Sequence, residues 1–187
     1  MESFLVSLTT VAIAEMGDRT QLLSLLLAAK FRKPLPIIAG IFLATIANHA
    51  AAGFVGTWFG RYLTPRLLDG IVGASIVVMA LWVLKPDTVD ENEEISGRNA
   101  FFATLGAFFV AEIGDKTQIA TVALAAAYRD LLAVVAGTTT GMMLANIPVV
   151  FLGDSFAKRL PLRAIRYACS ALFVAIGIVF LTRALAS

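Results

Sequence analysis

AEMGDRTQL at residues 14–22 lies inside an apolar stretch that runs from Phe4 to Ala29, and the chain repeats it as AEIGDKTQI at residues 111–119. Each copy places two carboxylates, one basic side chain and one glutamine among aliphatic residues. A charge at the centre of a bilayer costs at least about 2.5 kcal/mol on insertion scales. Two copies of so costly a pattern predict a functional site.

The apolar stretches around the motif are long enough to cross a bilayer. Of the 187 residues, 59% are hydrophobic, which exceeds the share typical of a soluble domain, and a spanning helix needs about 20 apolar residues. Lipid admits only helices or closed barrels, and these stretches are too long and too uniformly apolar for barrel strands. We therefore expect an all-α integral membrane protein with six transmembrane helices, at residues 4–29, 34–59, 67–84, 100–127, 131–152 and 163–184.

The motif belongs to a longer internal repeat. An offset of 97 residues maps Glu15 onto Glu112, and Asn48 meets Asn146 after one extra residue. We expect a single membrane domain over residues 1–187, with repeat one at 1–84, an acidic linker loop at 85–99 and repeat two at 100–187. Three helices per repeat is an odd number, so the two copies must cross the membrane in opposite senses. Such inverted repeats are typical of secondary transporters.

Basic residues are divided unevenly between the two sets of loops. Nine follow the first, third and fifth expected helices, and four lie on the opposite side. Positive charge favours the cytoplasmic side, which places the acidic loop 85–99 in the cytoplasm and both termini outside a cell (inner) membrane. The acidic residues of that loop either attract cations electrostatically or belong to a solvated linker. We favour the solvated linker. The four residues are Asp90, Glu91, Glu93 and Glu94.

The motif acids are candidate metal ligands. Glu15 and Asp18 are three residues apart and would share one helix face, and Glu112 and Asp115 repeat the spacing. Carboxylates are hard oxygen ligands that suit Ca²⁺, Mg²⁺ or Mn²⁺. With its one basic residue each motif has a net charge of −1, so one divalent cation neutralises both motifs. Crowded buried acids without the metal would bind protons, which predicts exchange of a metal ion for H⁺.

The charged residues also admit a structural interpretation. Arg19 and Lys116 follow the motif glutamates by four residues, a spacing at which ion pairs form within one helix. Such pairs would neutralise the glutamate of each motif but leave the aspartate without a charge partner, so we favour a metal site. Whether the two basic residues gate the pathway, compete with the metal or only neutralise charge stays open.

Several other polar residues are candidate ligands or pathway residues. Glutamine and asparagine also bond between helices, and threonine bonds back to its own helix, which is what we expect of the two threonines. His49, the only histidine, is expected to be a bonded core residue rather than a ligand or proton relay. The candidates are Gln21, Gln118, Thr20, Thr117, Asn48 and Asn146.

A glycine lies inside each motif, at Gly17 and Gly114. Glycine either breaks a helix and exposes carbonyl groups to an ion, or it lets another backbone approach closely. We expect the packing role.

The twin E-x-G-D-K/R-T motif, with six expected helices in two halves and an acidic loop between them, resembles the signature of the Gdt-type cation/proton exchangers. That family includes Golgi manganese and calcium transporters and bacterial manganese exporters. The resemblance covers essentially the whole chain. It implies transport of Mn²⁺ or Ca²⁺, with Glu15, Asp18, Glu112 and Asp115 as ion ligands, and Mn²⁺ efflux in the bacterial branch.

The leading hypothesis is a secondary transporter, not an enzyme. It would export a divalent cation, Mn²⁺ before Ca²⁺, in exchange for H⁺, with the metal bound between the two repeats. A passive cation channel or a proton-coupled carrier of another solute remains an alternative. An intramembrane metal-dependent enzyme is less favoured, because the sequence has neither H-E-x-x-H nor a nucleophile beside a base.

The composition limits the partners. One cysteine allows no disulfide within the chain, and a net charge of +2 without a basic patch argues against nucleic-acid binding. We expect no cofactor, and the expected partners are the metal ion, protons and the lipid bilayer. The oligomeric state stays open between a monomer and a homo-oligomer.

Overall fold

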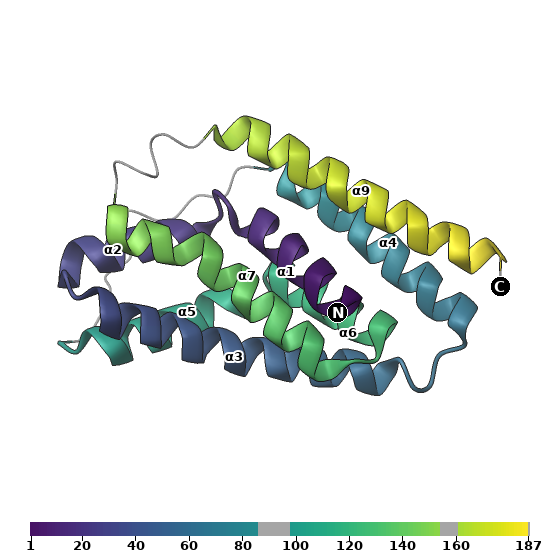
Figure 1. The fold of residues 1–187 in the computed structure, drawn as a ribbon, viewed down its shortest axis with the longest axis horizontal. Coiled ribbons are helices and arrows are strands. Elements are labelled where there is room, and N and C mark those ends of the chain that lie inside the picture. The colour runs from purple at the N-terminus through teal and green to yellow at the C-terminus, as the bar shows by residue number, and fades with distance from the viewer. Residues whose placement is uncertain (86–97, 154–160, 187) are drawn as a thin grey trace.

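The computed structural model describes residues 1–85, 98–153 and 161–186. In these ranges every regular element is a helix (Figure 1), so the all-α prediction is confirmed. The acids of the expected linker loop lie outside the described residues, and their role stays a prediction.

The first half of the chain begins with two short helices where one continuous helix was predicted at 4–29. Helix α1 spans Glu2–Glu15 and α2 spans Arg19–Phe31. Two long helices follow, α3 over Pro34–Phe59 and α4 over Pro65–Val83. Both long helices begin with proline, whose fixed φ suits the first helical turn and whose missing N–H costs nothing there.

The second half repeats this order. Helix α5 spans Ala100–Glu112 and α6 spans Lys116–Tyr128, so the continuous helix predicted at 100–127 is also interrupted. The long helices α7, Leu131–Leu152, and α9, Leu162–Ala186, follow. Each half of the described chain therefore contains two short helices and then two long ones.

The two interruptions lie at the motif glycines. Gly17 has φ of 80° and Gly114 has φ of 75°, in the left-handed region that glycine enters without a steric penalty. A Cβ added to Gly114 would meet no atom within 4 Å. The packing role expected for the motif glycines is therefore wrong for Gly114, and at both positions the backbone turn is what requires glycine.

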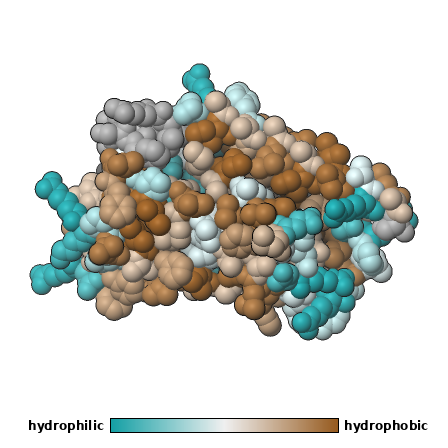
Figure 2. Space-filling view, viewed as in Figure 1, coloured by the Kyte–Doolittle hydropathy of each residue, from teal (hydrophilic) through white to brown (hydrophobic). Residues whose placement is uncertain are grey.

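Helix length separates the long helices from the short ones. Within the described part of the chain, four helices are long and apolar enough to cross a membrane, namely α3, α4, α7 and residues 163–186 of α9. The short helices have 13 or 14 residues, about 20 Å of helix, which is less than the roughly 30 Å of a hydrocarbon core. Hydrophobic side chains cover the middle of the face in Figure 2, and hydrophilic ones gather mostly towards its two ends.

The short helices of each half pack on a long helix of the other half. Helix α1 packs on α7, and its counterpart α5 packs on α3, while α4 and α9 lie together along one side (Figure 1). The contact between α1 and α7 is close, since a Cβ on Gly141 would lie 2.6 Å from the Leu8 carbonyl oxygen. This approach brings the polar residues of α7 next to the first motif.

Candidate functional site

Each interruption positions one glutamate and one aspartate in the same way. Glu15 ends α1 and Asp18 is the N-cap of α2, while Glu112 ends α5 and Asp115 is the N-cap of α6. All four residues are buried, at 0–3% exposure. The shared helix face expected for each pair is replaced by a turn, and each aspartate lies at a helix N-terminus, where the helix dipole favours negative charge.

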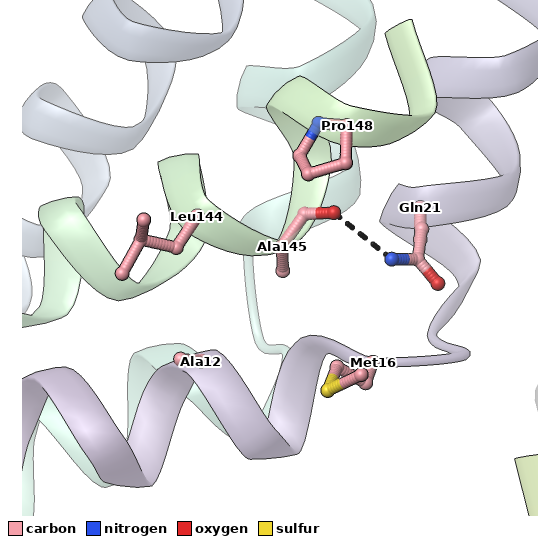
Figure 3. A pocket seen from close by; sticks show the side chains of 6 residues that line it. All are labelled: Ala12, Met16, Gln21, Leu144, Ala145 and Pro148. Carbon is pink, nitrogen blue, oxygen red and sulfur yellow. Dashed lines mark hydrogen bonds between the residues drawn. The ribbon is translucent and has the colours of Figure 1, made fainter. Parts of the chain in front are cut away.

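The motif glutamines stabilise the two turns. Gly17 N–H donates to Gln21 Oε1 at 2.8 Å, and Gly114 N–H donates to Gln118 Oε1 at 2.7 Å. Gln21 Nε2 also donates to the Ala145 carbonyl of α7 at 3.0 Å (Figure 3). The glutamines therefore form hydrogen bonds with backbone groups that have no partner at the ends of the interrupted helices. A ligand role for the glutamines stays a prediction.

The two basic side chains pair across the halves. Lys116 Nζ contacts Asp18 Oδ1, and Arg19 Nη2 lies 3.5 Å from Asp115 Oδ1. Arg19 also donates to the Ala111 carbonyl near the end of α5. The expected i,i+4 pairs assumed a continuous helix through each motif, and the turn at the glycine removes that geometry.

The two glutamates keep one oxygen each without a hydrogen-bond partner. Glu15 Oε1 accepts from Asn146 Nδ2 at 3.3 Å, and Glu112 Oε2 accepts from Thr117 Oγ1 at 3.2 Å. Glu15 Oε2 and Glu112 Oε1 are buried and unpartnered. A buried carboxylate oxygen without a partner is costly, so these two atoms mark where a ligand would be bound most favourably.

The threonine hydroxyls bond to motif carboxylates, not to the helix backbone as expected. Thr20 Oγ1 lies 3.2 Å from Asp18 Oδ2, and Thr117 Oγ1 lies 3.2 Å from Asp115 Oδ2. Each motif threonine therefore orients the aspartate two residues before it.

Asn146 and His49 occupy equivalent positions beside the two glutamates. Asn146 of α7 bonds to Glu15, and His49 Nε2 of α3 lies 3.6 Å from Glu112 Oε2. They are 97 residues apart, the same offset as the motifs, so the one-residue shift that matched Asn146 with Asn48 is wrong. Asn48 Nδ2 instead donates to the Phe109 carbonyl of α5 at 3.1 Å.

One residue of this network was missed by the sequence analysis. Ser24 Oγ of α2 donates to Asn146 Oδ1 at 2.7 Å, and both residues are buried. Ser24 lies three residues after Gln21, one turn along the same helix face. That spacing was the signal that would have found it.

The four acids gather in one region without converging on a point. The ion pairs across the halves place Asp18 beside the second motif and Asp115 beside the first. Yet among the described residues no three His, Cys, Asp or Glu side chains are placed to hold a metal ion as they stand. The two aspartates are held by cations of the protein, so the arrangement seen here is one in which Lys116 and Arg19 neutralise them.

A cavity of about 160 Å³ lies beside the first turn (Figure 3). Gln21 lies at its edge, and Pro148 interrupts the hydrogen-bond ladder of α7 because proline has no N–H to donate. The cavity provides space for small solutes next to the motif. Its lining residues are Ala12, Met16, Gln21, Leu144, Ala145 and Pro148.

Interrupted apolar helices that carry buried acids are features of secondary transporters. The chain belongs to the divalent cation/proton antiporter GDT1 family, whose model matches residues 3–91 and 100–187. It is therefore a multi-pass membrane protein of a transporter family, and the expectation that it is not an enzyme is confirmed. No solved structure matches it.

Two relatives show the range of the family. A protein of Vibrio cholerae, described as a "Putative manganese exporter", is 54% identical over 175 residues, which cover 93% of this chain and 88% of the relative. The divalent cation/proton antiporter GDT1 of Saccharomyces cerevisiae is 23% identical over 239 residues, with 98% of this chain and 85% of the relative covered.

Proposed function

We propose that this protein exports Mn²⁺ from the cytoplasm in exchange for H⁺, with Ca²⁺ as the second choice of cargo. The ion is bound between the two halves by Glu15, Asp18, Glu112 and Asp115. The observation that carries the proposal is the pair of buried glutamates, each with an unpartnered oxygen at a helix turn. The relative named as a manganese exporter supports Mn²⁺ as the cargo.

Six membrane crossings follow from pairing the short helices. We infer that α1 with α2, and α5 with α6, cross the bilayer as two interrupted spans, which adds two crossings to those of α3, α4, α7 and α9. Residues 1–84 and 100–187 then form two inverted repeats. The matching contacts of α1 with α7 and of α5 with α3 support this arrangement.

The ion pairs across the halves give the metal a competitor. Asp18 and Asp115 can bind a metal only when Lys116 and Arg19 withdraw, because each carboxylate is already neutralised by a cation. Binding of the metal would thus loosen contacts that tie one half to the other. Such loosening permits the rocking motion by which inverted repeats alternate access.

Charge balance couples the metal to protons. The two motifs together carry −2, from four acids and two basic residues, and one Mn²⁺ neutralises them. When Mn²⁺ leaves, the buried region regains two negative charges, which are unfavourable away from water. Protons from the outside restore neutrality, and their release to the cytoplasm completes the exchange.

The test is ion flux into proteoliposomes of the purified chain, with and without a pH gradient. We expect gradient-driven Mn²⁺ flux in the wild type and at least about tenfold less in Asp18→Asn and in Asp115→Asn. Asp130→Asn is the matched control, because Asp130 caps α7 outside the motifs and asparagine can also cap. Mn²⁺ flux of equal size with and without the pH gradient would favour a passive channel. Flux that is unchanged in both aspartate variants would overturn the proposed site.

A further inference from the structure

His49 is a buried polar side chain whose hydrogen bonds are unmade. It lies in α3 at 0% exposure, and neither Nδ1 nor Nε2 has a hydrogen-bond partner. Buried polar side-chain atoms are nearly always bonded, and leaving one unpaired is unfavourable. The core role expected for His49 required a bonded ring, which the structure does not contain. A ligand that bonds to the imidazole would remove this unfavourable state.

The His49 ring faces a motif carboxylate. Nε2 lies 3.6 Å from Glu112 Oε2, beyond normal hydrogen-bond length. Nitrogen and oxygen ligands lie about 2.0–2.2 Å from a zinc-sized ion, so two atoms that share such an ion are at most about 4.4 Å apart. The separation of 3.6 Å therefore allows Nε2 and the carboxylate to bind one ion together. Glu112 Oε1, which is also unpartnered, adds a further donor on the same residue.

The equivalent position in the other half has a different chemistry. Asn146 is satisfied by protein groups, since its Nδ2 donates to Glu15 and its Oδ1 accepts from Ser24. In the second half, the residue that corresponds to Ser24 at the 97-residue offset is Thr121. Its hydroxyl donates to the Thr117 carbonyl of its own helix. The site is thus asymmetric, with an amide beside one glutamate and an unpaired imidazole beside the other.

We propose that His49 Nε2 is a ligand of the transported ion, together with Glu112, and that this nitrogen selects Mn²⁺ over Ca²⁺. The inference rests on the proposed function, because it assigns a further ligand to the same site. Ca²⁺ is bound by oxygen ligands, whereas first-row transition ions also accept imidazole nitrogen. One nitrogen in an otherwise carboxylate site therefore favours the transition ion.

The first test is spectroscopic and uses the full chain in detergent with any affinity tag removed. His49 is the only histidine in the sequence, so imidazole nitrogen coupling in the pulsed electron paramagnetic resonance spectrum of bound Mn²⁺ can come from no other residue. We expect this coupling in the wild type and its loss in His49→Asn. Bound Mn²⁺ without imidazole coupling in the wild type would overturn the proposal, whether or not the variant folds.

The second test compares affinities for the two ions. His49→Asn recreates the residue found in the other half, and we expect its Mn²⁺ affinity to fall at least about tenfold while its Ca²⁺ affinity changes less than about threefold. Thr45→Val, one turn away on α3 at a buried hydroxyl without a partner, is the matched control and should leave both affinities unchanged. Equal losses for both ions, or none, would overturn selection by His49. Failure of the wild type to bind either ion would instead overturn the proposed function.

Discussion

Lys116 and Arg19 have the same kind of partner in different surroundings. The Lys116 side chain is 3% exposed and contacts Asp18, whereas the Arg19 side chain is 39% exposed and lies 3.5 Å from Asp115. Removing one member of a buried pair leaves an uncompensated charge, and an ion pair contributes less to stability when one of its members is exposed. The two residues should therefore differ in their effect on stability even though they hold equivalent positions.

Replacement of Lys116 by methionine should destabilise the fold far more than the same change at Arg19. We expect a loss of about 3 kcal/mol for Lys116→Met, because Asp18 stays buried without its cation. The loss for Arg19→Met should be smaller, because the Arg19 side chain is 39% exposed and Asp115 keeps the hydrogen bond from the Thr117 N–H. Denaturant unfolding in detergent measures both. Added Mn²⁺ should recover part of the loss in Lys116→Met, since the metal takes over the neutralising role. Equal losses in the two variants would contradict this account of the pairs.

At the scale of elements, the helix breaks depend on backbone conformation and not on crowding. Gly114 has a positive φ and open space where a Cβ would be added. The turn is also stabilised by Gln118, whose oxygen accepts from the Gly114 N–H. An alanine there would clash with nothing but would disfavour the turn and favour continuation of the helix.

Gly114→Ala should lower both stability and transport. We expect a cost of about 1–2 kcal/mol from the left-handed backbone alone, and a loss of metal-dependent flux as the turn is perturbed. The matched control is Gly106→Ala in α5, which also has no atom near the added Cβ but has no positive φ. It should be neutral or stabilising by up to about 1 kcal/mol. Similar stability in the two variants would mean that the turn is not held by glycine.

The apolar pattern of the sequence predicts where the uninterrupted helices begin and end, but it does not predict the interruptions at the two motifs. Helices α3 and α7 begin and end where the sequence predicts, because proline or a charged residue bounds each apolar stretch. The pattern continues through both motifs, so nothing in its periodicity marks a turn at Gly17 or Gly114. Cross-half contacts such as Lys116–Asp18 depend on the packing of distant segments, and spacing within one motif therefore pointed to the wrong pairs.

At the scale of the whole molecule, orientation in the membrane decides the direction of transport. From the loop charges we infer that the segment between α2 and α3 lies in the cytoplasm and that the segment between α3 and α4 lies outside. Exposed residues report on both, since Lys33 lies in the first segment and Tyr62 in the second.

Thiol labelling tests this orientation. The single cysteine, Cys169, is buried and can be replaced by alanine to give a cysteine-free background. In intact cells a membrane-impermeant thiol reagent should label Tyr62→Cys directly and Lys33→Cys only after permeabilisation. The reverse pattern would invert the proposed topology and the inferred direction of export.

The central claim is that the two motifs build one metal site between the halves of the chain. The measurement that tests it most directly is the Mn²⁺ stoichiometry of the purified protein, in the wild type, in Glu15→Gln and in Glu112→Gln. A shared site predicts one Mn²⁺ per chain in the wild type and loss of that ion in either single variant, because both glutamates would then bind the same ion. Two ions per chain, with half of the binding left in each variant, would contradict the claim and mean that each motif binds alone.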